Sequence, residues 1–130
     1  MNAGQLVDIA MRAKEKAYVP YSNFRVGAAV LAKSGKVYYG CNIENASFGA
    51  TNCAERTAIF KAVSEGEREI EAIAINSDSR KPTYPCGICR QVMAEFSTDL
   101  KIYISNIDGE YREFTLDQLL PGGFRGEDMK

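Results

Sequence analysis

Histidine is absent from this 130-residue chain. Its absence excludes Ser-His-Asp and Cys-His catalysis in their usual forms. It also excludes every histidine-ligated metal site and every proton shuttle that depends on an imidazole. A base that works near neutral pH must therefore be a carboxylate, a lysine, a tyrosine or a cysteine, and a site for a soft metal must be built from cysteine.

The chain also lacks an excess of positive charge and a long apolar segment. Lysine and arginine total 16 against 17 aspartate and glutamate residues. This balance gives no basic surface to release counterions from a phosphate backbone, so we expect no nucleic-acid partner. No apolar run approaches the length of a membrane span, so we expect no membrane partner. Residues 1–7 carry no secretory signal pattern, so we expect a cytoplasmic protein with reduced thiols.

The composition is that of an ordinary globular protein. Apolar residues make up 45% and charged residues 25% of the chain. A chain of this length buries roughly two-thirds of its unfolded surface and needs no disulfide staple. We therefore expect one domain over residues 1–130, with the polar stretch 122–130 as a flexible tail unless a partner orders it.

Apolar periodicity and turn residues predict nine elements in the order α-β-β-α-β-α-β-β-α. The predicted helices cover residues 3–17, 53–65, 86–96 and 115–121, and the predicted strands cover residues 24–33, 36–41, 70–76, 100–105 and 110–114. The two hairpins predict antiparallel edges, and the central strand–helix–strand units predict parallel crossovers. The fold class is therefore α/β, with helices on both faces of a mixed five-stranded sheet.

Three of the four cysteines stand where a loop opens a predicted helix. Cys86 and Cys89 are three residues apart and share one face of a first helical turn, and Cys53 opens another helix. Backbone N–H groups and the positive end of the helix dipole favour thiolates there. Three sulfurs leave a tetrahedral Zn²⁺ with one open position, as in catalytic sites. Glu55 can reach a water in that position without being a ligand.

This pattern resembles that of the zinc deaminases, with cysteine in place of the histidine ligand. The chain as a whole resembles a cytidine deaminase of the small, homotetrameric, three-cysteine type. The resemblance covers nearly the whole chain and rests on Tyr21-Ser22-Asn23-Phe24, Val26-Gly27-Ala28-Ala29, Asn42-Ile43-Glu44-Asn45-Ala46, Cys53-Ala54-Glu55-Arg56, Pro85-Cys86-Gly87, Cys89-Arg90-Gln91 and Leu119-Leu120-Pro121-Gly122 with Phe124.

The resemblance implies a fold, a cofactor and a reaction. The fold would be the three-layer α-β-α sandwich of the cytidine deaminases. One Zn²⁺ per chain would be held by Cys53, Cys86 and Cys89. The reaction would be hydrolysis of free cytidine and deoxycytidine to uridine and deoxyuridine plus ammonia, in pyrimidine salvage. A hydroxide formed at the metal would attack C4 while Glu55 moves the protons.

The resemblance also implies the residues that contact the substrate. Phe24 would pack on the base, Asn42 and Glu44 would bind the ribose 3′-hydroxyl, and the backbone N–H of Ala54 would donate to the base carbonyl. In a homotetramer with shared active sites, a neighbouring subunit's pocket would be reached by Ala46, Phe48 and Phe124.

Two further expectations follow from charge. Three thiolates give the zinc centre a net negative charge, which weakens its pull on water. We therefore hypothesise that Arg56 donates hydrogen bonds to the sulfurs, with a contribution from Gln91. The carboxylate of Glu44 would repel a 3′-phosphate, so the substrate should be a free nucleoside rather than a polynucleotide.

Several other interpretations remain open from the residues alone. Cys41 can complete a closed structural Cys₄ zinc site, and Cys86 with Cys89 can form a thioredoxin-like redox pair. Glu55 can be a solvated glutamate of a first helical turn, and Phe24 can be part of the core. The alternative functions are deamination of a modified cytosine nucleoside of the blasticidin type, or a zinc-stabilised binding module without turnover.

Overall fold

The computed structural model describes residues 1–130, and its elements follow the predicted order. The strands are β1 (Val26–Ala32), β2 (Val37–Cys41), β3 (Ile70–Ser77), β4 (Lys101–Ser105) and β5 (Tyr111–Thr115). The helices are α1 (Ala3–Ala13), α2 (Ala54–Ser64), α3 (Gly87–Glu95) and α4 (Leu116–Leu119), with 3₁₀ turns at Lys14–Lys16, Phe48–Ala50 and Gly126–Met129. The largest difference from the prediction is at the first helix, which leaves the α conformation after Ala13.

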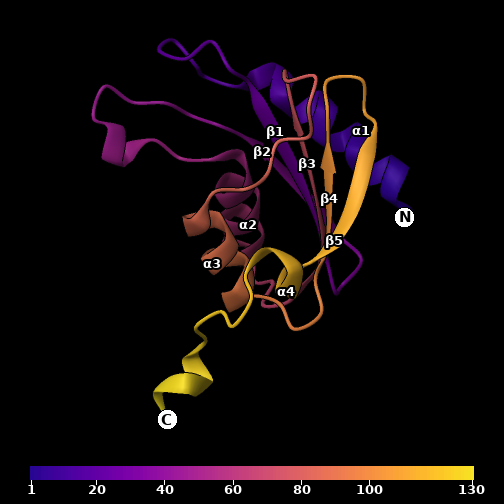
Figure 1. Cartoon of the computed structure of the whole chain (residues 1–130), viewed down its shortest axis with the longest axis vertical. Coiled ribbons are helices and arrows are strands. Elements are labelled where there is room, and N and C mark those ends of the chain that lie inside the picture. Colours follow the sequence, from indigo (N-terminus) through magenta and orange to yellow (C-terminus); the bar gives the residue numbers. More distant parts are fainter.

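The five strands form one mixed sheet in the order β2-β1-β3-β4-β5 (Figure 1). The hairpins β1–β2 and β4–β5 are antiparallel, as predicted, and β3–β4 is parallel. Strand β1 also pairs antiparallel with β3, so β2 and β3 run in the same direction on either side of β1. The crossover through α2 therefore joins parallel strands that are not neighbours.

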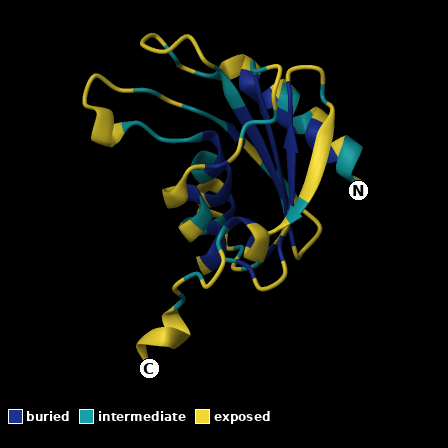
Figure 2. Cartoon of the chain, in the orientation of Figure 1, coloured by how far each residue is buried: buried dark blue, intermediate teal, exposed yellow.

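Helices cover both faces of the sheet, which confirms the predicted layers. Helix α1 packs on one face, and α2 and α3 pack on the other (Figure 1). The three central strands β1, β3 and β4 are largely buried, whereas the edge strand β5 is largely exposed (Figure 2). Burial of a large apolar side chain contributes about 1.5–3 kcal/mol to stability. On the α1 face the core includes Leu6 and Val7, and on the other face it includes Ile59, Ile73 and Met93.

Helix α1 lies unusually close to β1. A Cβ atom at Gly27 would stand 2.1 Å from the carbonyl oxygen of Ala10 and 2.6 Å from the backbone nitrogen of Lys14. Only glycine allows this approach without a backbone shift. The close packing brings the 3₁₀ turn after α1, with the buried side chain of Lys14, to the start of β1.

The C-terminal segment leads away from the body of the molecule (Figure 1). As far as Arg125 it is tied to the end of α3, because Arg125 Nη1 donates hydrogen bonds to the carbonyl oxygens of Ala94 (2.6 Å) and Ser97 (2.8 Å). The turn that follows is exposed. Among all the helices, none has the length and hydrophobicity that crossing a bilayer requires.

Candidate active site

Three cysteine sulfurs meet where α2 and α3 begin. The Sγ atoms of Cys53, Cys86 and Cys89 lie within 4.8 Å of one another, and the first two are 3.8 Å apart. Cys53 and Cys86 are the N-cap residues of the two helices, and Cys89 follows in the first turn of α3. Two sulfurs bound tetrahedrally at about 2.3 Å from Zn²⁺ lie about 3.8 Å apart. The cluster is therefore positioned to hold zinc.

The fourth cysteine stays outside this cluster. Cys41 lies on β2, and the group of side chains that can share one ion contains the other three cysteines only. The closed Cys₄ interpretation is therefore wrong. Cys86 and Cys89 are both free thiols and share their cluster with a third sulfur, which differs from an isolated redox pair.

Arg56 lies against the cluster as hypothesised. Its Nη2 donates a hydrogen bond to the Sγ of Cys53 at 3.3 Å. The pKa of Cys53 is lowered to about 5, because the Cys89 thiol and the Arg56 guanidinium both donate to its sulfur. The pKa of Cys89 is raised, because this thiol is bonded to the Cys53 sulfur and is buried. The local electrostatics thus favour a thiolate at Cys53.

Removing the Arg56 guanidinium should weaken the metal site. We expect Arg56→Ala to lower zinc affinity and turnover by about 10- to 100-fold, because a group that withdraws charge from the ligands is lost. Competition with a chromogenic chelator measures the affinity. Arg112→Ala, on the exposed face of β5, is the matched control and should bind zinc like the wild type. Unchanged zinc affinity and turnover in Arg56→Ala would contradict the role.

Glu55 is a buried carboxyl group beside the sulfurs. It is 4% exposed and forms no ion pair. Burial raises its pKa to about 7, although its own backbone N–H and the Cys89 thiol favour the ionised form. The interpretation of Glu55 as a solvated surface glutamate is therefore wrong. Ala54 is also buried and is the first residue of α2. Its backbone N–H has no hydrogen-bond acceptor within the helix, because the first four N–H groups of an α-helix have none.

The loop that carries Phe24 is held by Asn42 and Glu44. Asn42 Nδ2 donates to the Phe24 carbonyl oxygen, and its Oδ1 accepts from the Val26 N–H, both at 2.9 Å. Glu44 accepts two backbone N–H groups and a hydroxyl from residues 21–22. The hydroxyl contributes most to lowering the Glu44 pKa, so this side chain stays ionised. Phe24 is 36% exposed, so the alternative interpretation of Phe24 as a core residue is wrong.

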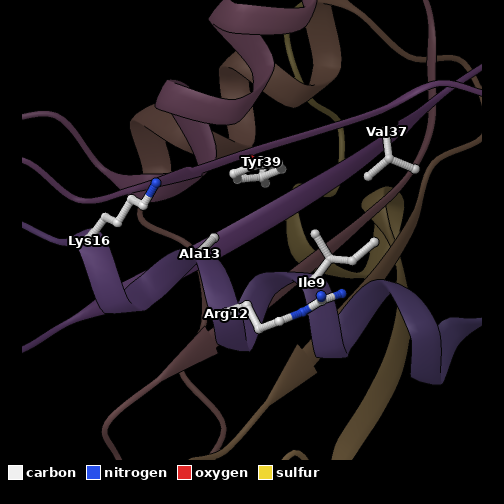
Figure 3. Close-up of a pocket in the computed structure, with 6 residues that line it drawn as sticks. All are labelled: Ile9, Arg12, Ala13, Lys16, Val37 and Tyr39. Carbon is white, nitrogen blue, oxygen red and sulfur yellow. The ribbon is translucent and has the colours of Figure 1, made fainter.

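A hollow of about 390 Å³ opens between the loops that carry Phe24 and Glu44. Its walls are formed by Tyr21, Ser22, Glu44, Asn45, Phe48 and Thr51. A second cavity, of about 370 Å³, lies between α1 and β2 and has no residue in common with the predicted site; Figure 3 shows its lining residues. The first hollow, with a carboxylate in its wall, is the one that adjoins the predicted ribose contacts.

The residues expected to serve a neighbouring subunit are exposed. Ala46 lies in an open loop, Phe48 is 81% exposed and Phe124 is 57% exposed. Gln91 differs from the prediction. Its Nε2 donates to the carbonyl oxygen of Phe124 at 2.6 Å, not to a sulfur. Two helical positions separate Gln91 from Cys89, which places the two side chains on nearly opposite faces of α3. Gln91 therefore anchors the C-terminal segment.

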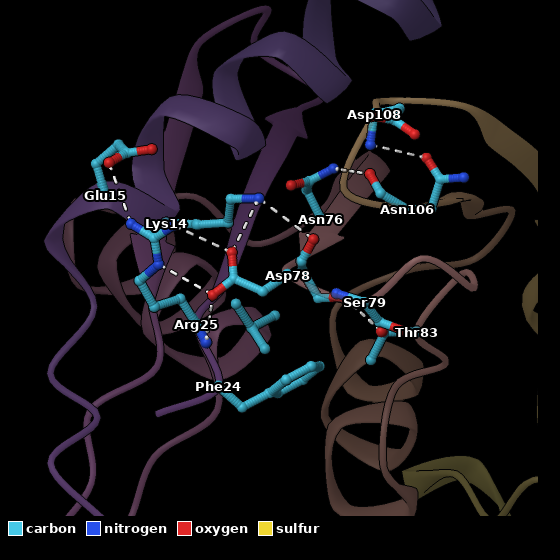
Figure 4. Close-up of polar contacts among 12 residues, drawn as sticks. Lys14, Glu15, Phe24, Arg25, Asn76, Asp78, Ser79, Thr83, Asn106 and Asp108 are labelled. Atoms are coloured by element: carbon cyan, nitrogen blue, oxygen red, sulfur yellow. Dashed lines mark hydrogen bonds and ion pairs between the residues drawn. The ribbon is translucent and has the colours of Figure 1, made fainter. Parts of the chain in front are cut away.

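The sequence analysis missed one group of polar residues next to Phe24. Arg25, Asp78 and Lys14 form an ionic network at the ends of β1 and β3 (Figure 4). No motif marks them, because only the register of two antiparallel strands brings Arg25 and Asp78 together.

Comparison with known proteins agrees with this geometry. A family model described as the cytidine and deoxycytidylate deaminase zinc-binding region matches residues 1–105. A cytidine deaminase of Halalkalibacterium halodurans is 56% identical over 99% of this chain and 98% of its own length. A cytidine deaminase of Sporosarcina psychrophila is 51% identical over 99% of this chain and 96% of its own length. The crystal structure of a Burkholderia pseudomallei cytidine deaminase superimposes with a TM-score of 0.91 at 47% identity, over 95% of this chain and all of that one. The chain therefore belongs to the cytidine and deoxycytidylate deaminase family.

Proposed function

We propose that the protein hydrolyses free cytidine and deoxycytidine to uridine and deoxyuridine, with release of ammonia. The observation that carries this proposal is the buried carboxyl group of Glu55 beside three sulfurs that can share one zinc ion. Membership of the deaminase family and the names of the most similar relatives support the same reaction.

The chemistry divides between the cofactor and one carboxyl group. Cys53, Cys86 and Cys89 would hold Zn²⁺, which when bound lowers the pKa of a water molecule and so supplies a nucleophile near neutral pH. Glu55 takes a proton from the attacking water and delivers it to N3 of the base. It then moves a second proton to the leaving amine. Cytidine and water thus become uridine and ammonia, and Glu55 returns to its starting state.

The remaining residues orient the nucleoside. Phe24 packs on the base, and the Ala54 N–H donates to its carbonyl oxygen. Asn42 and Glu44 bind the ribose 3′-hydroxyl. An ionised carboxylate offers about four acceptor positions, and the protein uses three of those on Glu44. The one remaining acceptor position suits a hydrogen bond from a single hydroxyl group. The negative charge of the Glu44 carboxylate would repel a 3′-phosphate.

We also propose that the active form is a homotetramer in the cytoplasm that serves pyrimidine salvage. Ala46, Phe48 and Phe124 would reach a neighbour's pocket, and their exposure in the single chain supports this. A neighbour's loop would also exclude water from a zinc site that a small chain leaves open. The free cysteines suit a reducing compartment.

The direct test is ammonia release by the purified, zinc-loaded protein. We expect turnover of cytidine and deoxycytidine, sensitive to a zinc chelator, and little turnover of cytosine or 3′-CMP. Light scattering on the same sample gives the oligomeric state. Turnover of blasticidin-type nucleosides alone would favour the modified-nucleoside alternative. Bound zinc with no turnover of any of these compounds would favour a binding module.

A further inference from the structure

Arg25 and Asp78 are joined by four hydrogen bonds. The Arg25 side chain donates from Nε to Asp78 Oδ2 (3.0 Å) and from Nη2 to Oδ1 (3.1 Å). The Arg25 backbone N–H donates to the same carboxylate (3.2 Å), and the Asp78 N–H donates to the Arg25 carbonyl oxygen (3.2 Å). A paired guanidinium and carboxylate of this kind fixes orientation as well as distance. The two residues form a rigid unit (Figure 4).

This unit extends the ladder between β1 and β3 by one position. The last regular pair in the ladder joins Val26 and Ser77, and Arg25 and Asp78 are the next residues outward on each strand. Outward from this point, one segment of the chain leads back to Phe24 and the other runs on to Cys86. The position of the base-packing aromatic is therefore coupled here to the loop that supplies metal ligands.

The buried ammonium group of Lys14 also contacts Asp78 of this unit. Lys14 is 5% exposed, and its Nζ lies 3.4 Å from Asp78 Oδ1 and donates to the Ser77 carbonyl oxygen at 3.2 Å. Arg25 Nη1 also meets Glu15 at 3.2 Å. A buried ammonium needs a compensating charge, so Asp78 is held in place by the core as well as by Arg25.

The segments on both sides of the unit are themselves tied down. The hydroxyls of Ser77 and Thr83 are hydrogen-bonded at 2.5 Å, and the Ser79 N–H donates to Ser77 Oγ at 3.1 Å. These bonds fix the loop that runs from Asp78 toward Cys86. On the other side, the hydrogen bond from Asn42 fixes the Phe24 carbonyl group. A shift at the Arg25–Asp78 unit would therefore move the segment that carries Phe24 relative to the loop that leads to Cys86.

We propose that Arg25 and Asp78 are positioning residues for deamination, which hold Phe24 at a set distance from the cysteine cluster. The inference rests on the proposed function, since it takes Phe24 as the residue that packs on the base. Neither residue contacts the sulfurs, and both act through the backbone segments that they join. Their loss should leave zinc in place and misalign the base relative to the metal.

The test compares kcat, KM and zinc content in Arg25→Gln and Asp78→Asn. Misplacement by about 1 Å can cost about 100-fold in rate, and we expect kcat to fall about 10-fold in each variant. Zinc stoichiometry should stay at the wild-type value. The matched control is Lys33→Gln, which breaks an exposed ion pair with Glu69 and should keep wild-type kcat. Wild-type kcat in both Arg25→Gln and Asp78→Asn would overturn the inference.

A second comparison separates positioning from loss of structure. In a Phe24→Ala background the aromatic ring is gone, so Arg25→Gln should lower kcat by less than about 2-fold, the non-additivity expected of residues that act as one unit. If Arg25→Gln still lowered kcat by about 10-fold in the Phe24→Ala background, the proposed positioning role would be overturned. A wild-type protein without cytidine turnover would instead refute the proposed function itself.

Discussion

Replacement of Glu55 by glutamine should abolish turnover and leave the metal in place. Glutamine has nearly the same shape as glutamate but cannot take up and release a proton. We expect kcat for cytidine to fall by about 10³-fold or more, within the range of about 10²- to 10⁴-fold that general acid–base catalysis supplies. Zinc should remain bound, because Glu55 is outside the group of three sulfurs that hold it. Ammonia release and zinc content by atomic absorption measure the two effects.

The control for Glu55→Gln is the same exchange at Glu95. This glutamate is also helical but lies exposed near the end of α3, and its variant should keep wild-type activity. If Glu55→Gln retained more than about one-tenth of wild-type kcat, proton transfer would have to be assigned to another group. Loss of zinc from Glu55→Gln would show that the side chain supports the metal site instead.

The elements of this fold could be predicted from the sequence because each has a local signal. Apolar spacing predicts α1 and α2, and the Asp108-Gly109 turn predicts the hairpin of β4 and β5. The end of α1 could not be predicted, because apolar spacing continues to Ala17 while the chain changes conformation at Lys14. This turn has a tertiary cause, since the Lys14 side chain is buried and meets Asp78, the residue that follows β3. The position of β1 between β2 and β3 likewise has no local signal.

In the candidate site, too, contacts between residues close in sequence could be predicted, whereas contacts made through tertiary structure could not. Residues close in sequence could be predicted to meet, because helix geometry places Cys86 beside Cys89 and Arg56 beside Cys53, each pair three positions apart. The same geometry argues against Gln91, which lies two positions from Cys89. The Arg25–Asp78 pair could not be predicted, because its residues lie 53 positions apart and meet only through strand register.

Replacement of Cys89 by alanine should remove zinc and with it both activity and part of the stability. Cys89 is fully buried, and its sulfur is one of only three that can share the ion. Structural zinc sites bind with about 10–16 kcal/mol, so each of three protein ligands supplies about 3–5 kcal/mol, and losing one should lower the affinity by about 200-fold or more. Ligand binding stabilises the folded state by mass action, so added zinc should raise the Tm of the wild type and have little effect on Cys89→Ala. Zinc titration followed by calorimetry measures both quantities.

The matched control is Cys41→Ala, which removes the one cysteine that stands outside the cluster. This variant should bind one zinc per chain, retain wild-type turnover and show the same rise in Tm with added zinc. The two variants each lose a single sulfur, so the comparison isolates metal ligation from cysteine content. If Cys41→Ala lost zinc as Cys89→Ala does, a closed four-cysteine site would be restored and no open position would remain for a water molecule. Zinc loss confined to Cys89→Ala would exclude Cys41 as the fourth ligand, which is the result expected of a three-cysteine site that leaves one position for water, as a zinc hydrolase needs.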